Sequence, residues 1–395
     1  MRRFRIGSAF GIPIKLDLTF LLVLPLFAWI IGTQVGQTAA VLNDSLGAGL
    51  DAAALTGGTL VWLLGVAAAV GLFVGIVLHE LGHSLVAIRY GYPIDSITLW
   101  LFGGIAQFDE MPENWKQELV IAVAGPLVSV AVGVLSYVAF LVLPATGATA
   151  LESARFVLAY LAVMNVALAA FNMLPGFPMD GGRVLRALLA RTRPYARATE
   201  IAAEVGKGFA VLLGLFGLFV LGNLFIAGLA FFIYIGAAGE SRQTTMRAAF
   251  EGVTVRDVMT PADHVTSVTR EMSVSDLIRT MFEERHTGYP VERDGEVVGL
   301  VTLEDARAVR EVERDAYTVG DVMTTDLVTV DPDTPVMDAL NDLQENSVGR
   351  LLVTDADGEF EGLLTRSDIM TALSIIKSGG KYAAGSDRRA MRPEP

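Results

Sequence analysis

The chain has 395 residues, of which 52% are hydrophobic, and carries a net charge of −13 with a mean hydropathy of +0.50. Such an apolar composition is atypical of soluble proteins and indicates membrane spans. The acidic balance argues against nucleic acid as a partner, because phosphate binding needs a basic surface. The chain has no cysteine, so disulfides and thiolate metal sites are excluded, and only four histidines are available as imidazole ligands.

A change of composition near residue 240 divides the chain into an apolar part and an acidic, ordinary globular part. A membrane span needs about 20 apolar residues. Six segments come close to this requirement, the last two being short and joined as a hairpin: 17–34, 59–88, 118–143, 154–174, 207–221 and 223–238. We therefore expect residues 1–240 to form a membrane domain of about six transmembrane helices.

Basic residues indicate the orientation of these spans. They precede the first span at Arg2, Arg3 and Arg5, and they cluster again after the fourth, whereas loops 35–57 and 144–153 have none. Short loops rich in Lys and Arg stay in the cytoplasm. We expect both termini to be cytoplasmic, with the first apolar run acting as an anchor rather than as a cleaved signal.

The segment 92–108 is apolar but rich in β-favouring residues, and it contains the pair Gly103-Gly104. It predicts a short hairpin or re-entrant strand rather than another helix. Non-helical backbone at membrane depth must be buried in protein or line a wet cavity.

The second span contains His79-Glu80-Leu81-Gly82-His83. Positions i and i+4 share one face of a helix, so both imidazoles can reach one metal ion while Glu80 acts as general base. Ionisable groups in an apolar span are costly and are usually functional. The alternative is a pair of core histidines beside an incidental glutamate.

Asp180 is the best candidate for a third metal ligand. Catalytic zinc takes three protein ligands and keeps one open position, and the other histidines, His264 and His286, lie in the globular part. Asp180 follows a stretch of prolines and glycines at 175–178 that cannot continue a helix. A role as the N-cap of a following helix is the alternative.

These motifs together resemble the site-2 protease family of intramembrane zinc metalloproteases. The resemblance covers about residues 1–240 and includes the Asn172-x-x-Pro-x-x-x-x-Asp-Gly pattern and Gly125-Pro126-Leu127-Val128-Ser129. It implies one Zn²⁺ per chain, held by His79, His83 and Asp180, with Glu80 as catalytic acid/base.

The same resemblance suggests that Asn172 holds substrate or stabilises the oxyanion. It also suggests that the strand element containing Phe102, Gly103 and Gly104 positions an unwound substrate segment. A capping role for Asn172, a packing role for Gly125 and a plain turn at the glycine pair are the structural alternatives.

The globular part contains an internal repeat of about 64 residues. Val255-Arg256-Asp257-Val258-Met259-Thr260 recurs as Val319-Gly320-Asp321-Val322-Met323-Thr324. We expect a linker at 241–252, one repeat at 253–313, a second at 314–378 and a disordered tail at 379–395.

The repeats resemble cystathionine-β-synthase (CBS) domains, which occur in pairs. The resemblance implies an adenosine nucleotide at residues that end one strand of each repeat, and it allows homodimerisation. The candidate nucleotide-binding residues are Thr302, Asp305, Thr365 and Asp368. The acidic surroundings argue against polyphosphates, and a purely structural module is the alternative.

The predicted protein is thus a polytopic α-helical membrane protein followed by a soluble α/β tandem CBS domain pair. Its expected activity is zinc-dependent hydrolysis of peptide bonds in or near transmembrane segments of membrane-anchored proteins, as in regulated intramembrane proteolysis. The alternatives are a CBS-regulated membrane transporter, which would require an internal repeat or a lined charge route, and a non-catalytic zinc-binding membrane protein.

Overall fold

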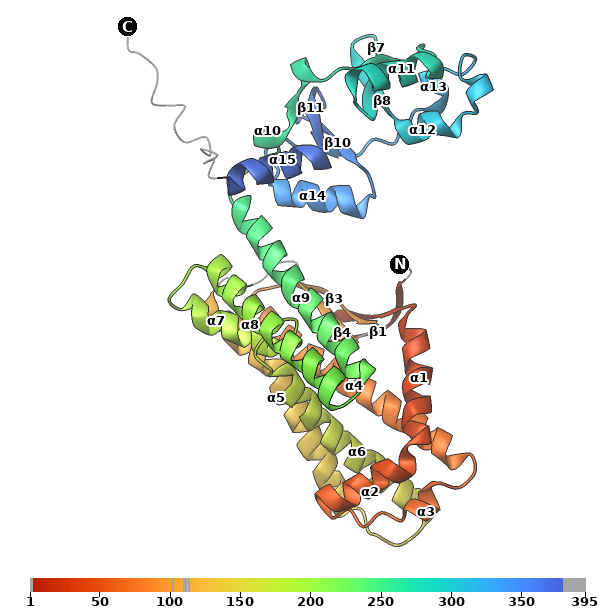
Figure 1. Ribbon diagram of the computed structural model, residues 1–395, viewed down its shortest axis with the longest axis vertical. Helices are drawn as coiled ribbons and strands as arrows, with labels where there is room; N and C mark the ends of the chain where they lie inside the picture. The colour runs from red at the N-terminus through yellow and green to blue at the C-terminus, as the bar shows by residue number, and fades with distance from the viewer. Residues whose placement is uncertain (1–2, 101–102, 109–111, 113, 379–395) are drawn as a thin grey trace. The chain divides into compact units, whose positions relative to one another are not determined.

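The computed structural model describes residues 3–378 apart from 101–102, 109–111 and 113. The chain divides into two compact units, residues 1–244 and 245–395. The first unit is a helical bundle with one small sheet, and the second contains two mixed sheets flanked by short helices (Figure 1). Phe102 and the predicted disordered tail lie outside the described residues.

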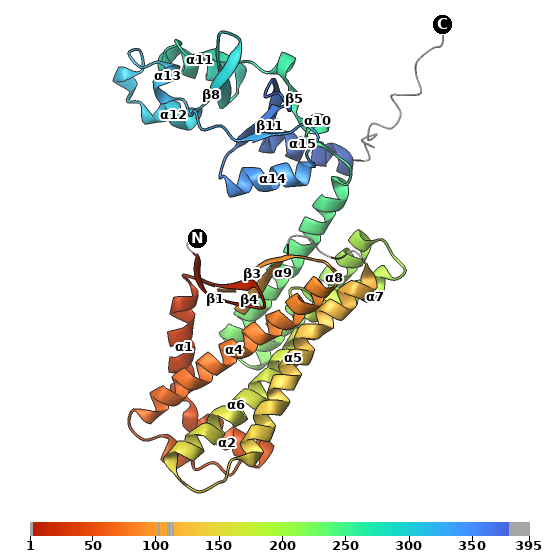
Figure 2. The same ribbon diagram turned by 180° about the vertical axis from the view of Figure 1, so that it is seen from behind.

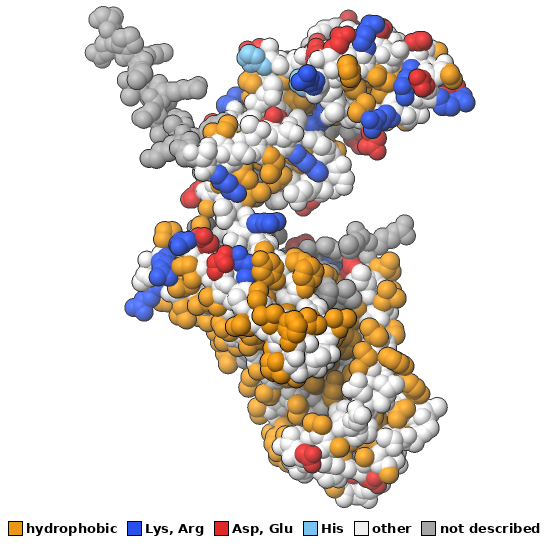
Figure 3. Space-filling view, in the orientation of Figure 1, with side chains coloured by type: hydrophobic (Ala, Val, Ile, Leu, Met, Phe, Trp, Pro, Cys, Tyr) orange, Lys and Arg blue, Asp and Glu red, His pale blue; other side chains and the backbone are white. Residues whose placement is uncertain are grey.

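The helices of the first unit follow the apolar segments of the sequence. They are α1 (Phe20–Thr33), α2 (Val35–Leu46), α3 (Ala52–Leu55), α4 (Leu60–Arg89), α5 (Trp115–Val142), α6 (Thr149–Asn172), α7 (Asp180–Ala190), α8 (Tyr195–Leu215), the π-helical turn η1 (Phe216–Val220) and α9 (Leu224–Ala249). Hydrophobic side chains cover the face of this unit seen in Figure 3, and charged ones gather near the α7–α8 connection. This distribution is that of a protein whose outer surface contacts lipid.

Within the described residues, five helices are long and apolar enough to cross a membrane, or six if a bent pair counts as one span. That pair is α1 and α2, which meet at an angle of 68°. The prediction of about six spans is therefore confirmed by length and composition. The first span differs from the expected single helix, and α8 begins at Tyr195, earlier than the apolar run at 207–221.

The bend at the end of α1 is stabilised by a separate hydrophobic core. Val35 and Leu42 of α2 and Leu55 of α3 are buried against α4 and α6. Arg155 of α6 adds polar contacts there, because its Nη2 donates to the Ala48 carbonyl at 2.8 Å. The loop predicted at 35–57 is therefore mostly a packed, helical cap.

A four-stranded sheet lies against α4 at one end of the bundle (Figures 1 and 2). Its order is β1 (Arg3–Ala9), β2 (Ile12–Asp17), β3 (Ile94–Trp100) and β4 (Gly103–Phe108). The antiparallel β3–β4 pair is the hairpin predicted for 92–108. The sequence analysis missed the β1–β2 hairpin, which adds to this sheet through the parallel β2–β3 pair.

Glycines allow the helices of the bundle to approach closely. A Cβ on Gly65 of α4 would lie 2.2 Å from the Ala28 carbonyl oxygen of α1, and one on Gly82 would lie 3.0 Å from the Ala124 carbonyl oxygen of α5. Helices packed at such distances keep a defined axial position, because any added methyl group would force them apart.

Between α6 and α7 the chain is non-helical at 173–179, as the prolines and glycines predict. Helix α7 begins at Asp180, and its N-cap is Met179 rather than Asp180. The structure therefore does not support the capping role considered for Asp180.

The second unit contains the two repeats. The first repeat contains α10 (Val255–Val258), β5 (Thr260–Pro261), η2 (Ala262–His264), β6 (Val268–Thr269), α11 (Val274–Glu284), β7 (Gly288–Arg293), β8 (Glu296–Thr302), α12 (Leu303–Ala308) and η3 (Glu311–Glu313). The second contains α13 (Val319–Val322), β9 (Thr329–Val330), α14 (Val336–Glu345), β10 (Arg350–Thr354), β11 (Phe360–Thr365) and α15 (Arg366–Lys377).

One of the two sheets of this unit contains strands from both repeats. One sheet has the order β6-β7-β8, and the other has the order β5-β11-β10-β9, so that β5 of the first repeat pairs with β11 of the second. The repeated aspartates Asp257 and Asp321 complete capping boxes with Thr254 and Thr318. Each Asp-Val-Met-Thr motif therefore lies at the end of a short helical turn, and its aspartate caps the start of that turn.

The Gly65→Ala substitution tests the close approach of α1 and α4. The added methyl group cannot fit at 2.2 Å from a carbonyl oxygen, so we expect a loss of about 1–3 kcal/mol of stability and a lower Tm in detergent. Gly228→Ala on α9 is the control, because its Cβ would meet nothing within 4 Å. Equal Tm values for the two variants would contradict this packing.

Candidate metal centre

Two buried imidazoles lie one turn apart on α4. His79 and His83 share one face of the helix, as the i, i+4 spacing predicts, and their Nε2 atoms are 3.2 Å apart. Both side chains are almost completely enclosed by the bundle.

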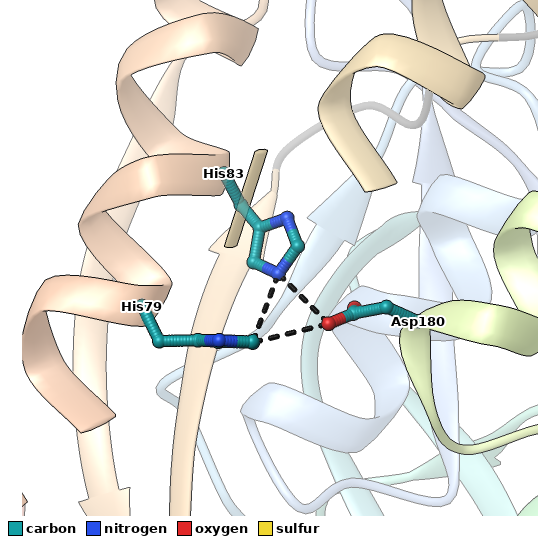
Figure 4. A group of neighbouring side chains, drawn as sticks. All are labelled: His79, His83 and Asp180. Atoms are coloured by element: carbon teal, nitrogen blue, oxygen red, sulfur yellow. Dashed lines mark hydrogen bonds and ion pairs between the residues drawn. The ribbon is translucent and has the colours of Figure 1, made fainter. Parts of the chain in front are cut away.

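Asp180 meets this pair from the start of α7 (Figure 4). Its Oδ2 lies 3.0 Å from His79 Nε2 and 3.1 Å from His83 Nε2. The carboxylate comes from a segment about a hundred positions later in the chain. The structure thus brings together all three of the predicted ligands.

The donor set fits a zinc ion. Ligands held at about 2.0–2.1 Å from zinc in a tetrahedral arrangement are about 3.3 Å apart, close to the distances between the three atoms here. Among the described residues, His79, His83 and Asp180 are the group whose ligand atoms could share one metal ion.

Helix α5 orients both imidazoles. Ser129 Oγ lies 2.9 Å from His79 Nδ1, and the Ile121 carbonyl oxygen lies 2.7 Å from His83 Nδ1. Such contacts to the outer ring nitrogen leave Nε2 for the metal and hold the ring in place. The sequence analysis did not assign these roles, although Ser129 belongs to the motif at 125–129.

Gly125 lies between these two contacts, on the same face of α5. A Cβ at this position would be 2.1 Å from His83 Nε2. The expected packing role of Gly125 is therefore specific, because this glycine leaves the space that the imidazole occupies.

Glu80 lies beside the cluster and against the sheet. A Cβ on Gly104 of β4 would be 2.7 Å from Glu80 Cγ, so the carboxylate side chain passes directly over the backbone of β4. In the order β1-β2-β3-β4, this strand is one of the two edge strands. Gly103 begins the same strand.

Asn172 ends α6, eight positions before Asp180, and is half-buried. Its Nδ2 donates to the Leu168 carbonyl of its own helix at 3.0 Å. The proposed contact with substrate or oxyanion stays a prediction.

The four candidate residues of the second unit form helix caps. Asp305 Oδ2 accepts from the backbone and hydroxyl of Thr302, and Asp368 Oδ2 does the same for Thr365. Each pair also lines a cavity. Thr302 and Asp305 line one of about 410 Å³, and Thr365 and Asp368 line one of about 530 Å³.

Comparison with known proteins supports the family resemblance predicted for each part of the chain. Residues 67–213 match the model of peptidase family M50, and residues 255–311 and 319–375 match CBS domains. Zinc metalloprotease MJ0392 of Methanocaldococcus jannaschii is 33% identical over 94% of this chain and 96% of its own length.

Two solved structures are also similar. The site-2 protease from M. jannaschii is 35% identical and covers 61% of this chain and 95% of its own, with a TM-score of 0.41. CBSX2, crystallised in complex with AMP, is 36% identical and covers 31% of this chain and 98% of its own, with a TM-score of 0.29.

Gly125→Ala tests the fit between α5 and the histidine pair. The methyl group would occupy the position of the His83 ring, so we expect zinc affinity to fall by at least about 10-fold, as when supporting contacts of a metal site are lost. Gly208→Ala on α8 meets nothing within 4 Å and should bind zinc like the unaltered protein. Competition with a chromogenic chelator measures both, and unchanged affinity in Gly125→Ala would contradict the geometry.

Proposed function

Because the chain belongs to the site-2 protease family of zinc metalloproteases (peptidase family M50) with a C-terminal CBS pair, we propose that His79, His83 and Asp180 hold its catalytic zinc. The observation that carries this proposal is the triangle of two Nε2 atoms and one Oδ2 atom, 3.0–3.2 Å on a side. The proposed reaction is hydrolysis of a peptide bond in or near a transmembrane segment of a membrane-anchored protein.

Glu80 is the proposed general acid/base. Zinc bound by the three ligands supplies a Lewis acid that activates water and polarises the peptide carbonyl. Glu80 follows His79 directly on α4, so its carboxylate lies at the border of the metal cluster and β4. From there it can take a proton from the attacking water and return it to the leaving amine.

Strand β4 is the proposed docking edge for substrate. A peptide bond inside a helix is shielded, so a transmembrane substrate must unwind before it is cut. An unwound segment can pair with an edge strand through backbone hydrogen bonds. Gly104 lets the Glu80 side chain lie directly against the backbone of this strand, so a segment paired with the strand would lie close to that carboxylate. Phe102 and Gly103 stay predicted members of the positioning group.

Asn172 is proposed to stabilise the oxyanion or to hold substrate. Its place at the end of α6, just before the broken segment that leads to Asp180, favours this role. Its Nδ2 carries a second N–H besides the one that donates to the Leu168 carbonyl, and this second N–H is the proposed donor to substrate or oxyanion.

We also propose that both termini face the cytoplasm. The basic residues of the α7–α8 region and those of the N-terminus then lie on the same side, as the distribution of Lys and Arg requires. Homodimerisation through the CBS pair stays a proposal that the paired repeats favour.

Glu80→Gln distinguishes the proposed acid/base role of Glu80 from the metal-binding role of the three ligands. The amide cannot accept a proton, so we expect peptide hydrolysis to fall by about 10²–10⁴-fold with zinc content unchanged. Asp180→Ala should lose zinc and activity together. Glu200→Gln, an exposed position on α8, is the control.

These variants are compared by zinc content and by cleavage of a tagged transmembrane substrate in detergent or vesicles. Substantial activity in Glu80→Gln would contradict its assignment. Full zinc occupancy in Asp180→Ala would contradict the ligand set.

We propose that the larger cavity of the second unit binds an adenosine nucleotide. Basic side chains gather around it, whereas the smaller cavity has acidic ones. The larger is lined by His264, Arg285, His286, Arg350 and Arg366, with Asp368. The smaller shares Arg350 but adds Glu304, Asp305 and Asp326. The phosphates would therefore lie among the basic side chains of the larger cavity, even though acidic residues predominate in the unit as a whole.

Arg350 is the central cation of this proposal. Burial lowers the pKa of its guanidinium, and the carboxylates of Asp305 and Asp368 oppose that effect. A guanidinium remains charged at neutral pH and, when partly desolvated, gains from a bound phosphate. The capping box occupies Oδ2 of Asp368, which lines the larger cavity, and the ribose hydroxyls of a nucleotide bound there would donate to that carboxylate.

Arg350→Ala tests nucleotide binding. Loss of a charge-assisted contact worth about 1.5–3 kcal/mol should weaken AMP or ATP binding by at least about 10-fold in calorimetry of the full-length protein. The control is Arg279→Ala, an exposed residue that pairs with Asp276 on α11. Equal nucleotide affinity in the two variants, or no binding to the unaltered protein, would contradict the proposal.

A further inference from the structure

A second buried charge cluster lies six residues along α7 from Asp180, at Arg186. The side chain of Arg186 is only 1% exposed, which is exceptional for a guanidinium. Its Nε and Nη2 lie 2.6 Å from Glu118 Oε1 of α5, and its Nη1 lies 2.6 Å from Glu240 Oε1 of α9.

Two aromatic rings enclose the same guanidinium. Arg186 Cζ lies 4.9 Å from the centre of the Phe177 ring and 4.8 Å from that of Tyr195. Phe177 belongs to the broken segment before α7, and Tyr195 begins α8. Arg186 therefore joins α7 to α5, α8, α9 and the broken segment at one point.

This cluster holds the chain on both sides of Asp180. Asp180 is the first residue of α7, so the position of that helix sets the position of its carboxylate. Phe177 is three positions before Asp180, and Arg186 is six positions after it. A metal site tolerates displacement of its ligands by only about 0.5 Å, so a short aspartate on a broken segment needs such support.

A buried ion pair adds little net stability to a fold, because removing both charges from water costs about as much free energy as their attraction returns. Apolar side chains of similar size often give equal or greater stability. The rigid planar guanidinium of Arg186, in contrast, fixes orientation, because it donates to Glu118 through Nε and to Glu240 through Nη1 at the same time. The cluster is therefore better suited to setting the position of α7 than to adding stability.

We propose that Arg186 is a positioning residue for Asp180, anchored by Glu118 and Glu240, and that it makes the metal centre sensitive to the position of α9. This inference rests on the proposed ligand set. The Glu118 side chain is 5% exposed and that of Glu240 is 26% exposed, so the α9 contact is the weaker of the two anchors.

The test measures zinc affinity of the full-length protein in detergent, with zinc alone as the probe and a fluorescent chelator as competitor. Arg186→Met should weaken zinc binding by about 10–100-fold, the range for residues that support metal ligands. Arg186→Lys keeps the positive charge but loses the planar guanidinium and its stacking on the aromatic rings. Its zinc affinity should lie between those of Arg186→Met and the unaltered protein. Glu240→Gln should show a smaller loss.

The control is Arg197→Met on α8, which removes a guanidinium from an exposed pair with Glu200 and should leave zinc affinity unchanged. A purely structural role predicts a lower Tm with unaltered zinc affinity of the folded protein, and that result in Arg186→Met would overturn the inference. If Arg186→Met does not fold, unaltered affinity in both Arg186→Lys and Glu240→Gln overturns it equally. Absence of zinc binding by the unaltered protein would instead overturn the ligand set itself.

Discussion

The arrangement of the membrane unit depends on one set of side-chain contacts, in which the carboxylate of Asp180 at the start of α7 lies against the imidazoles of His79 and His83 on α4. Ionisable groups inside an apolar bundle are costly unless they are paired or bind a metal. The surrounding elements are arranged to satisfy this requirement. Helix α5 contacts both imidazoles through Ile121 and Ser129, and the segment before α7 is broken so that Asp180 can approach.

Much of this arrangement could be predicted from local pattern. The spacing of His79 and His83 predicts a shared helix face, because helix periodicity is a local property. The prolines and glycines before Asp180 predict a break for an equally local reason, and β-favouring residues predicted the β3–β4 hairpin. Asp180 itself followed from the absence of other ligands in a chain that has no cysteine.

The features that could not be predicted from the sequence are mostly contacts between segments far apart in the chain. The Ser129–His79 and Glu118–Arg186–Glu240 contacts join residues about 50–70 positions apart, and no local period brings them together. The β1–β2 hairpin was missed because its basic residues were interpreted only as an orientation signal. In the second unit, the charge difference between the two cavities arises from side chains of both repeats and cannot be seen in either alone.

The most direct test of the account is the X-ray absorption spectrum of zinc in the detergent-purified protein at the zinc K-edge. The account predicts one zinc per chain with two imidazole ligands and oxygen ligands at about 2.0–2.1 Å, because the proposed ligands are two histidines and one aspartate. A spectrum without two imidazoles, or a protein that takes up no zinc, would contradict the central claim that His79, His83 and Asp180 form the metal centre.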